Sequence, residues 1–195
     1  VGKTTIARLF AKALNCLEGV SPEPCGKCTN CISIDEGNFM DLIEIDAASQ
    51  RGIDDIRELS KNSQYAPTQG LFKVYVIDEA HQITGAAFNA FLKTLEEPPQ
   101  HIKFLLATTE PEGFPITVLS RCLHFNLKRI SEKQIVERME EILEREKIKY
   151  EEGALSIISK SADGSMRDAL SLLDQALAYE DYELSENNVI DMLGL

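Results

Sequence analysis

Short apolar runs alternate with longer amphipathic stretches over the first two thirds of the chain. The clearest runs cover residues 41–46, 72–77 and 102–108, and a shorter run covers 122–125. Their β-branched, aromatic and aliphatic residues favour strands. Strands that alternate with helices are typical of βαβ units, so the pattern predicts an α/β fold with a mostly parallel sheet.

Helical spacing of apolar residues predicts helices over 6–14, 53–65 and 84–97, the last ending at a Pro-Pro pair that stops the hydrogen-bond ladder. From residue 131 onward only helical patterns occur. Ser131 with Gln134 predicts a capping box, Ser165 with Asp168 repeats it, and a last helix is expected near 186–192. The change of pattern near 128–131 predicts two domains, over residues 1–129 and 130–195.

Composition limits the classes of function. The 195 residues are 44% hydrophobic and 27% charged, which suits one α/β domain with a small satellite. No apolar run approaches the roughly 18 residues of a membrane span and no signal-peptide pattern is present, so we expect a cytoplasmic protein with no membrane contact. A net charge of -12 argues against a surface that wraps nucleic acid by itself, so any DNA contact must be local or shared.

A phosphate-binding motif lies at the start of the sequence. Gly2, Lys3, Thr4 and Thr5 match the second half of a Walker A loop. The glycine lets backbone amides approach phosphates, Lys3 brings positive charge to the β and γ oxygens, and the Thr4 hydroxyl ligates Mg²⁺. Four residues of this kind also occur by chance, so the motif needs a partner elsewhere in the chain.

That partner is an apolar run, 74–77, which ends in two carboxylates. Asp78 is expected to hold Mg²⁺, and Glu79 to orient and deprotonate the attacking water. The alternative is a solvated strand end, a common use of acidic residues. The acid pair follows Lys3 by about 75 residues in a βαβ pattern, which favours a P-loop ATPase that uses ATP and Mg²⁺.

Four clustered cysteines predict a structural Zn²⁺ site within a module over residues 16–37. They have the spacing C-x8-C-x2-C-x2-C, with glycine and proline between them: Cys16, Cys25, Cys28 and Cys31. Four thiolates can close a tetrahedral site with no open position. A redox CxxC pair is the alternative, but four clustered thiols favour a metal. Cys122 is expected to be an inert buried thiol in a strand.

These motifs, with the segments DLIEIDAAS, FKVYVIDEAH, FNAFLKTLEEPP, KFLLATTEP, SRC and GSMRDALSLLDQA, resemble the bacterial tau/gamma family of DNA polymerase III clamp-loader subunits. That family belongs to the AAA+ ATPases, and the resemblance covers nearly the whole chain. It implies a P-loop AAA+ parallel sheet with a zinc-binding insertion, followed by a small all-α lid domain. It also implies an N-terminally truncated fragment, because the family begins with an adenine-contacting segment, a central first strand and the start of the P-loop.

The resemblance also implies roles for three further residues. Thr109 resembles the sensor 1 residue, which touches the γ-phosphate or the water, and Arg167 resembles sensor 2, which reaches phosphates from the lid. Arg121, in Ser-Arg-Cys, resembles an arginine finger that acts in trans on the ATP of a neighbouring subunit, although a surface salt bridge is its simpler interpretation. His81 is expected either to bond the acid pair or to be structural, and Glu96 to be an ordinary helix-end residue.

The function that the resemblance implies is that of an ATPase motor subunit of the clamp loader within the DNA polymerase III holoenzyme. ATP binding and hydrolysis load a sliding clamp onto primed DNA, and the partners are other loader subunits in a ring-like hetero-oligomer. The alternatives are a non-hydrolysing scaffold subunit of the same loader and another AAA+ DNA motor. Intact Lys3, Thr4, Asp78 and Glu79 argue against the scaffold, and the four cysteines argue against the other motor.

Overall fold

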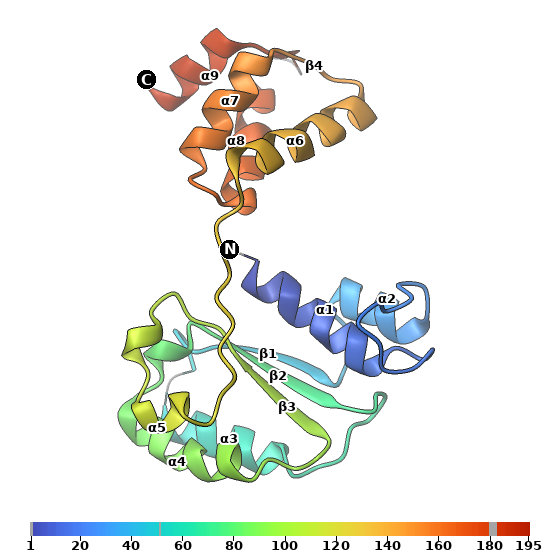
Figure 1. Cartoon of the computed structure of the whole chain (residues 1–195), viewed down its shortest axis with the longest axis vertical. Helices are drawn as coiled ribbons and strands as arrows, with labels where there is room; N and C mark the ends of the chain where they lie inside the picture. The colour runs from blue at the N-terminus through green and yellow to red at the C-terminus, as the bar shows by residue number, and fades with distance from the viewer. Residues whose placement is uncertain (1, 51, 180–182) are drawn as a thin grey trace. The chain divides into compact units, whose positions relative to one another are not determined.

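The computed structural model describes residues 2–50, 52–179 and 183–195. The chain forms two compact units, Gly2–Phe125 and Asn126–Leu195 (Figure 1). Each unit has its own hydrophobic core. None of the helices in the described part of the chain has the length and apolar character needed to cross a membrane.

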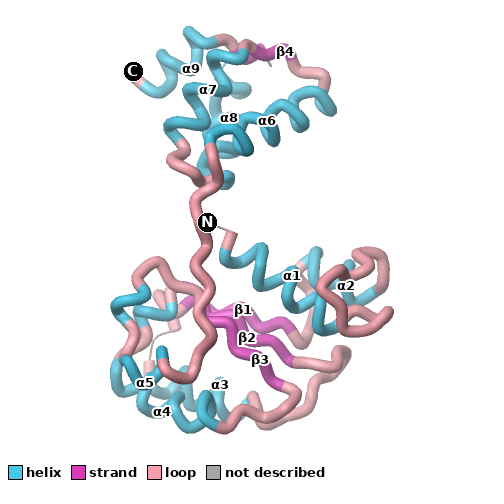
Figure 2. Tube along the Cα trace, in the orientation of Figure 1, coloured by secondary structure: helices cyan, strands magenta, loops and turns pink. Residues whose placement is uncertain are grey.

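A parallel sheet forms the centre of the first unit. Its three described strands are β1 (Leu42–Asp46), β2 (Lys73–Asp78) and β3 (Ile102–Leu106), and they lie side by side in sequence order (Figure 2). The register sets Asp46 beside Asp78 at one end of the sheet. The predicted α/β fold with a parallel sheet is confirmed, and each strand begins or ends within two residues of its predicted limits.

Helices cover both faces of this sheet (Figure 1). One face carries α1 (Lys3–Asn15) and α2 (Thr29–Glu36), and the other carries α3 (Ile53–Asn62), α4 (Gly85–Glu96) and α5 (Ile116–Leu119). Side chains alternate along β2, so Val74 and Val76 pack toward α1 and α2, whereas Tyr75 and Ile77 pack toward α3 and α4. Burial on both faces explains why this strand is a continuous apolar run.

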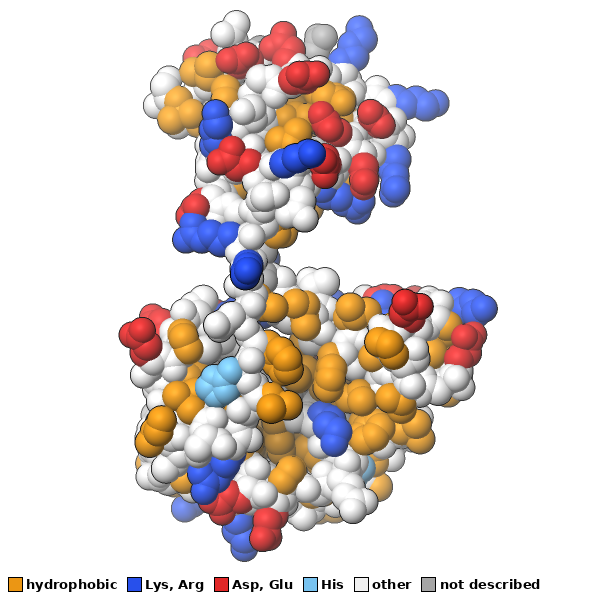
Figure 3. All heavy atoms as spheres, viewed as in Figure 1, with side chains coloured by type: hydrophobic (Ala, Val, Ile, Leu, Met, Phe, Trp, Pro, Cys, Tyr) orange, Lys and Arg blue, Asp and Glu red, His pale blue; other side chains and the backbone are white. Residues whose placement is uncertain are grey.

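Small residues let α1 approach the sheet closely. Ala7 and Ala11 are buried against β2, while Ile6, Leu9 and Phe10 on the outer side are 48%, 49% and 39% exposed. Figure 3 shows hydrophobic side chains gathered on the face of the unit that includes α1 and the sheet. The helix that begins at Lys3 is therefore fixed to the sheet by a narrow stripe of small side chains.

The predicted strand at 122–125 is wrong. The chain turns at Arg121 and continues without a sheet partner, and Leu123 and Phe125 are 87% and 81% exposed. An apolar run becomes a strand only when a neighbouring strand completes its hydrogen bonds, and the described residues supply none here. Cys122 is accordingly not in a strand; its thiol is half-buried against the core of the first unit, and this burial raises its pKa.

The second unit is helical. It contains α6 (Glu132–Glu146), α7 (Glu152–Ser161), α8 (Met166–Tyr179) and α9 (Glu186–Leu193), packed around a core that includes Met139 and Leu155. Ser131 and Gln134 form the predicted capping box, and the Ser165 hydroxyl accepts from the Asp168 amide. A two-residue parallel pair, β4 (Lys149–Tyr150) with β5 (Glu183–Leu184), was not predicted because so short a strand leaves no pattern.

A buried carboxylate organises the loop that leads into β2. Asp41 is fully buried just before β1, and its two oxygens accept hydrogen bonds from the amides of Thr68, Gln69 and Gly70 at 2.6 to 2.8 Å. Three backbone donors satisfy a charge that burial alone would make unfavourable. The sequence position of Asp41 suggested that it opens the strand. In the structure it lies just before β1 and anchors the loop that leads into β2.

We expect Asp41→Asn to lower the free energy of unfolding by about 2 to 4 kcal/mol, because the amide nitrogen cannot accept and leaves buried donors unpaired. Chemical denaturation followed by circular dichroism measures the change. Asp54→Asn is the control, since Asp54 pairs with Arg57 at the surface and its side chain is 91% exposed. Equal stability of the two variants would contradict the anchoring role.

Candidate functional site

The acid pair lies at the carboxyl end of the central strand. Asp78 is the last residue of β2 and Glu79 follows it. Backbone hydrogen bonds tie this point to both neighbouring strands: the Ala47 amide donates to the Asp78 carbonyl at 3.0 Å, and the Ala107 amide to that of Ile77 at 2.8 Å. The carboxyl edge of a parallel sheet is where ligands of α/β proteins bind, so the acid pair has a fixed place at the favoured edge.

The structure brings Lys3 to this acid pair. Gly2 precedes α1 in the left-handed backbone region, with φ of 76°, which glycine adopts without a steric penalty. Lys3 is the first residue of α1, and its Nζ lies 2.7 Å from Glu79 Oε1 and 3.3 Å from Asp78 Oδ1. The two motifs that the sequence separates by about 75 residues therefore meet at one point.

Electrostatics hold both partners in their charged forms. Desolvation acts to lower the pKa of Lys3, but hydrogen bonds to Glu79 and Asp78 outweigh it, and the pKa rises above its usual value. The hydrogen bond from Lys3 is the main cause of a lowered pKa at Glu79, with a smaller contribution from Thr109. Near neutral pH the site thus contains the Lys3 ammonium beside the ionised Glu79 carboxylate.

Polar groups after β3 and β2 fix the Glu79 carboxylate. The Thr109 hydroxyl donates to Glu79 Oε2 at 2.9 Å, and His81 Nδ1 lies 3.4 Å from the same oxygen and 2.9 Å from Thr108 Oγ1. His81 thus contacts the acid pair, one of the two possibilities that the sequence left open. Thr108 was missed, because only its neighbour Thr109 had a motif to mark it.

The backbone at Glu79 has an unusual conformation. Its φ of 45° and ψ of 41° lie in the left-handed region, which side chains other than glycine seldom adopt. The Glu79 amide donates to Asp78 Oδ1 at 2.9 Å, and a single turn of 3-10 helix, Ala80–Gln82, follows. This sharp change of direction points the Glu79 side chain back to Lys3 and Thr109.

Other predicted site residues lie outside this cluster. Thr4 is half-buried and Thr5 exposed in the first turn of α1. Arg121 follows α5 and pairs with Glu96, not with the acid pair. Arg167 is exposed in the first turn of α8, in the second unit. The structure thus joins Lys3 with Asp78, Glu79 and Thr109, and leaves the roles of the other residues as predictions.

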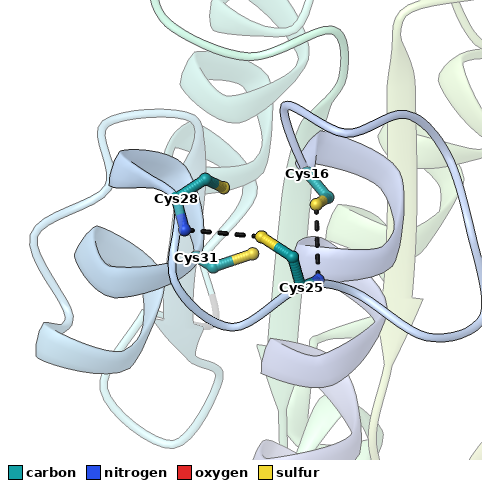
Figure 4. A group of neighbouring side chains, drawn as sticks. All are labelled: Cys16, Cys25, Cys28 and Cys31. Carbon is teal, nitrogen blue, oxygen red and sulfur yellow. Dashed lines mark hydrogen bonds between the residues drawn. The ribbon is translucent and has the colours of Figure 1, made fainter.

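The four clustered cysteines converge between the end of α1 and the start of α2 (Figure 4). Their Sγ atoms lie within 4.8 Å of one another, close to the separation of about 3.8 Å that Zn–S bonds of 2.3 Å require in a tetrahedron. Cys16 directly follows the last residue of α1, and Cys28 directly precedes the first residue of α2. The Cys25 amide donates to Cys16 Sγ at 3.5 Å, and the Cys28 amide to Cys25 Sγ at 3.4 Å. The donor set and its geometry fit one Zn²⁺.

The thiols of this cluster differ in acidity. A backbone hydrogen bond from Leu17 is the main cause of a lowered pKa at Cys28, and one from Cys25 lowers the pKa of Cys16. Burial raises the pKa of Cys31. Because a metal binds thiolates, the more acidic thiols favour binding, whereas the buried one must lose a proton to join.

Comparison with protein families finds matches over nearly the whole chain. The model described as DNA polymerase III, delta subunit, matches residues 1–131, which is most of the chain. The model described as DNA polymerase III clamp loader subunit, ATPase lid domain, matches residues 134–181.

Curated relatives agree with these families. The chain is 57% identical to DNA polymerase III subunit tau/gamma of Haemophilus influenzae over 195 residues, covering 100% of this chain and 28% of that protein. It is 56% identical to DNA polymerase III subunit tau of Escherichia coli over 194 residues, covering 100% of this chain and 30% of that protein. The chain therefore spans less than a third of these two relatives.

Solved structures support the fold class. The chain superposes on the Holliday junction branch migration motor RuvB of Thermotoga maritima with a TM-score of 0.67 and 16% identity, covering 100% of this chain and 58% of that one. At this identity the likeness concerns the fold alone.

Replacing Lys3 with Met should raise the pKa of Glu79 toward its ordinary value of about 4.3, because the variant removes the cation and hydrogen bond that lower it. NMR titration of the Glu79 carboxyl carbon measures this shift. By the same linkage, the contact of Lys3 with Glu79 adds to the free energy of unfolding of the wild-type protein above the unfolded-state pKa of Glu79. This contribution is lost as pH falls through the lower folded-state pKa of Glu79. Lys12→Met, on the same helix but paired with Asp35, is the control; an unchanged Glu79 titration in Lys3→Met would refute the assignment.

Proposed function

The chain belongs to the DNA polymerase III clamp-loader family of tau/gamma subunits, and from this premise we propose that it is the ATP-hydrolysing part of such a subunit. One observation carries the proposal: Lys3 Nζ lies 2.7 Å from Glu79 and 3.3 Å from Asp78 at the carboxyl edge of the parallel sheet. A cation and two acids at this edge are the groups that phosphoryl transfer to water requires.

Binding of the triphosphate would exchange the partners of Lys3. The ammonium turns from the carboxylates to β- and γ-phosphate oxygens, and the first amides of α1, next to Gly2, face the same anion. The Thr4 hydroxyl and the Asp78 carboxylate would hold Mg²⁺, whose charge offsets that of the phosphates. Thr5 continues this first turn of the helix, beside the bound nucleotide.

Hydrolysis would then depend on Glu79. Its lowered pKa keeps the carboxylate ionised, so that it can accept a proton from the attacking water. The Thr109 hydroxyl, 2.9 Å from the carboxylate, orients it and contacts the water or the γ-phosphate. The acid is thus held by Lys3 before nucleotide binds, and is freed for catalysis when the phosphates take over that cation.

The remaining roles belong to the assembled loader. Arg121 acts in trans on the ATP of the next subunit. The nucleotide-binding domain comprises residues 1–129 and the lid domain residues 130–195, and Arg167 of the lid domain contacts the phosphates. Other loader subunits form a ring-like hetero-oligomer with this one in the cytoplasm, and ATP turnover loads a sliding clamp onto primed DNA. A net charge of -12 supports a DNA contact made by the assembly rather than by this chain alone.

Two other functions receive less support. A scaffold subunit that does not hydrolyse ATP has no need for the contact of Lys3 with both acids. A branch-migration motor shares the fold, but only at 16% identity, against 57% for the tau/gamma relative. A branch-migration motor also offers no explanation for the four cysteines, which fit a Zn²⁺ site in a module over residues 16–37.

We expect Glu79→Gln, made in the full-length subunit within an assembled loader, to bind ATP normally but to lower turnover about 10²-fold or more, because the amide cannot take a proton. Nucleotide titration and steady-state hydrolysis give the two quantities. Glu58→Gln, on the exposed side of α3, is the matched control. Normal turnover in Glu79→Gln would remove Glu79 from the mechanism.

For the cysteine cluster we expect one Zn²⁺ per chain, measured by elemental analysis of the purified protein. Cys28→Ser should abolish it and lower the melting temperature, since a small loop with little core depends on the metal for its stability. Cys122→Ser should keep a full equivalent, because Cys122 lies outside the cluster. A metal-free wild-type protein with an unchanged fold after chelator treatment would contradict the structural role.

A further inference from the structure

The Arg121 guanidinium is held in a defined position by its own subunit. Nη1 donates to the Thr117 carbonyl at 2.6 Å and to the Ser120 hydroxyl at 3.2 Å, and Nη2 donates to the Glu96 carboxylate. Thr117 belongs to α5, Ser120 directly follows α5, and Glu96 is the last residue of α4. Two helix ends therefore hold one side chain.

Counting donors shows that this arrangement leaves part of the guanidinium available. An arginine has five N–H groups, and the bonds above use three of them. Among the described residues, the N–H of Nε and the second N–H of Nη2 have no partner. The side chain of Arg121 remains 32% exposed. The guanidinium is thus fixed along one edge and can still donate to an anion.

The position of Glu96 gives its carboxylate a reason to bind Arg121. As the last residue of α4, Glu96 adds negative charge to a helix end that already carries a partial negative charge. The Arg121 cation offsets this charge, and it also caps the carbonyl of Thr117 at the end of α5. Because the ion pair is exposed, it adds little to the stability of the fold. Its main physical effect is to restrict the orientations of Arg121.

We propose that Glu96 is the positioning residue for Arg121, holding its guanidinium in the orientation that meets the triphosphate of a neighbouring subunit. The inference rests on the proposed function of Arg121 as a group that acts in trans. An arginine that is already oriented loses less conformational entropy when it donates to a phosphate in the transition state. Glu96 itself touches no nucleotide; it acts through Arg121.

The test is Glu96→Gln in a full-length subunit of an assembled loader, with the variant confined to one side of a chosen ATP site. We expect kcat at the site that faces the variant's Arg121 to fall about tenfold or more, because small misplacements of catalytic groups have effects of this size. The KM for ATP and the melting temperature should stay unchanged, which a merely structural role for Glu96 would not predict. Glu97→Gln is the matched control, since Glu97 is exposed and its side chain has no bonding partner among the described residues.

Combining Glu96→Gln with Arg121→Ala distinguishes the positioning role of Glu96 from the role of Arg121 in trans. If Glu96 acts through Arg121, Glu96→Gln should have no further effect in the Arg121→Ala background. Full activity of Arg121→Ala alone would overturn the role of Arg121 in the proposed function. Reduced activity of Arg121→Ala, together with normal or raised activity of Glu96→Gln, would overturn the positioning role of Glu96. Raised activity of Glu96→Gln would mean that Glu96 holds the arginine away from the phosphates.

Discussion

The hydrogen-bond ladder that joins β2 to both of its neighbours is the constraint on which the site depends. It places Asp78 beside the end of β1 and carries the chain after β3 alongside Glu79, so that Thr109 reaches the same carboxylate. A shift of one residue in this register would turn the acid pair toward the opposite face of the sheet. Backbone geometry, more than any side-chain contact, therefore decides which groups can act together.

Close packing supplies the other half of the arrangement. Ala7 and Ala11 allow α1 to lie against β2, and this contact brings Lys3 to the edge where the acids lie. The same helix ends at Cys16, one of the four clustered thiols, so a single rigid element connects the proposed metal site with the proposed phosphate site. A bulkier residue at either alanine would push the helix away from the sheet and separate Lys3 from both acids.

The sequence predicts what depends on local pattern and misses what depends on partners. Buried strands and capped helices have their own signals, and the parallel sheet and the Ser131 cap are confirmed. The run at 122–125 has the composition of a strand, but no neighbouring strand in the described part of the chain completes it. Likewise, the order of the Lys3 and Asp78-Glu79 motifs indicates that they meet, whereas the pairing of Glu96 with Arg121, 25 positions apart, has no motif to reveal it.

The left-handed backbone of Glu79 sets a limit on how far this protein could be stabilised by redesign. Such a conformation costs a residue with a side chain on the order of 1 kcal/mol or more, and glycine would relieve it. A search guided by folding free energy alone would therefore favour glycine at this position and delete the carboxylate. The local strain at Glu79 is retained because the proposed chemistry requires a carboxylate there, although the strain lowers the stability of the fold.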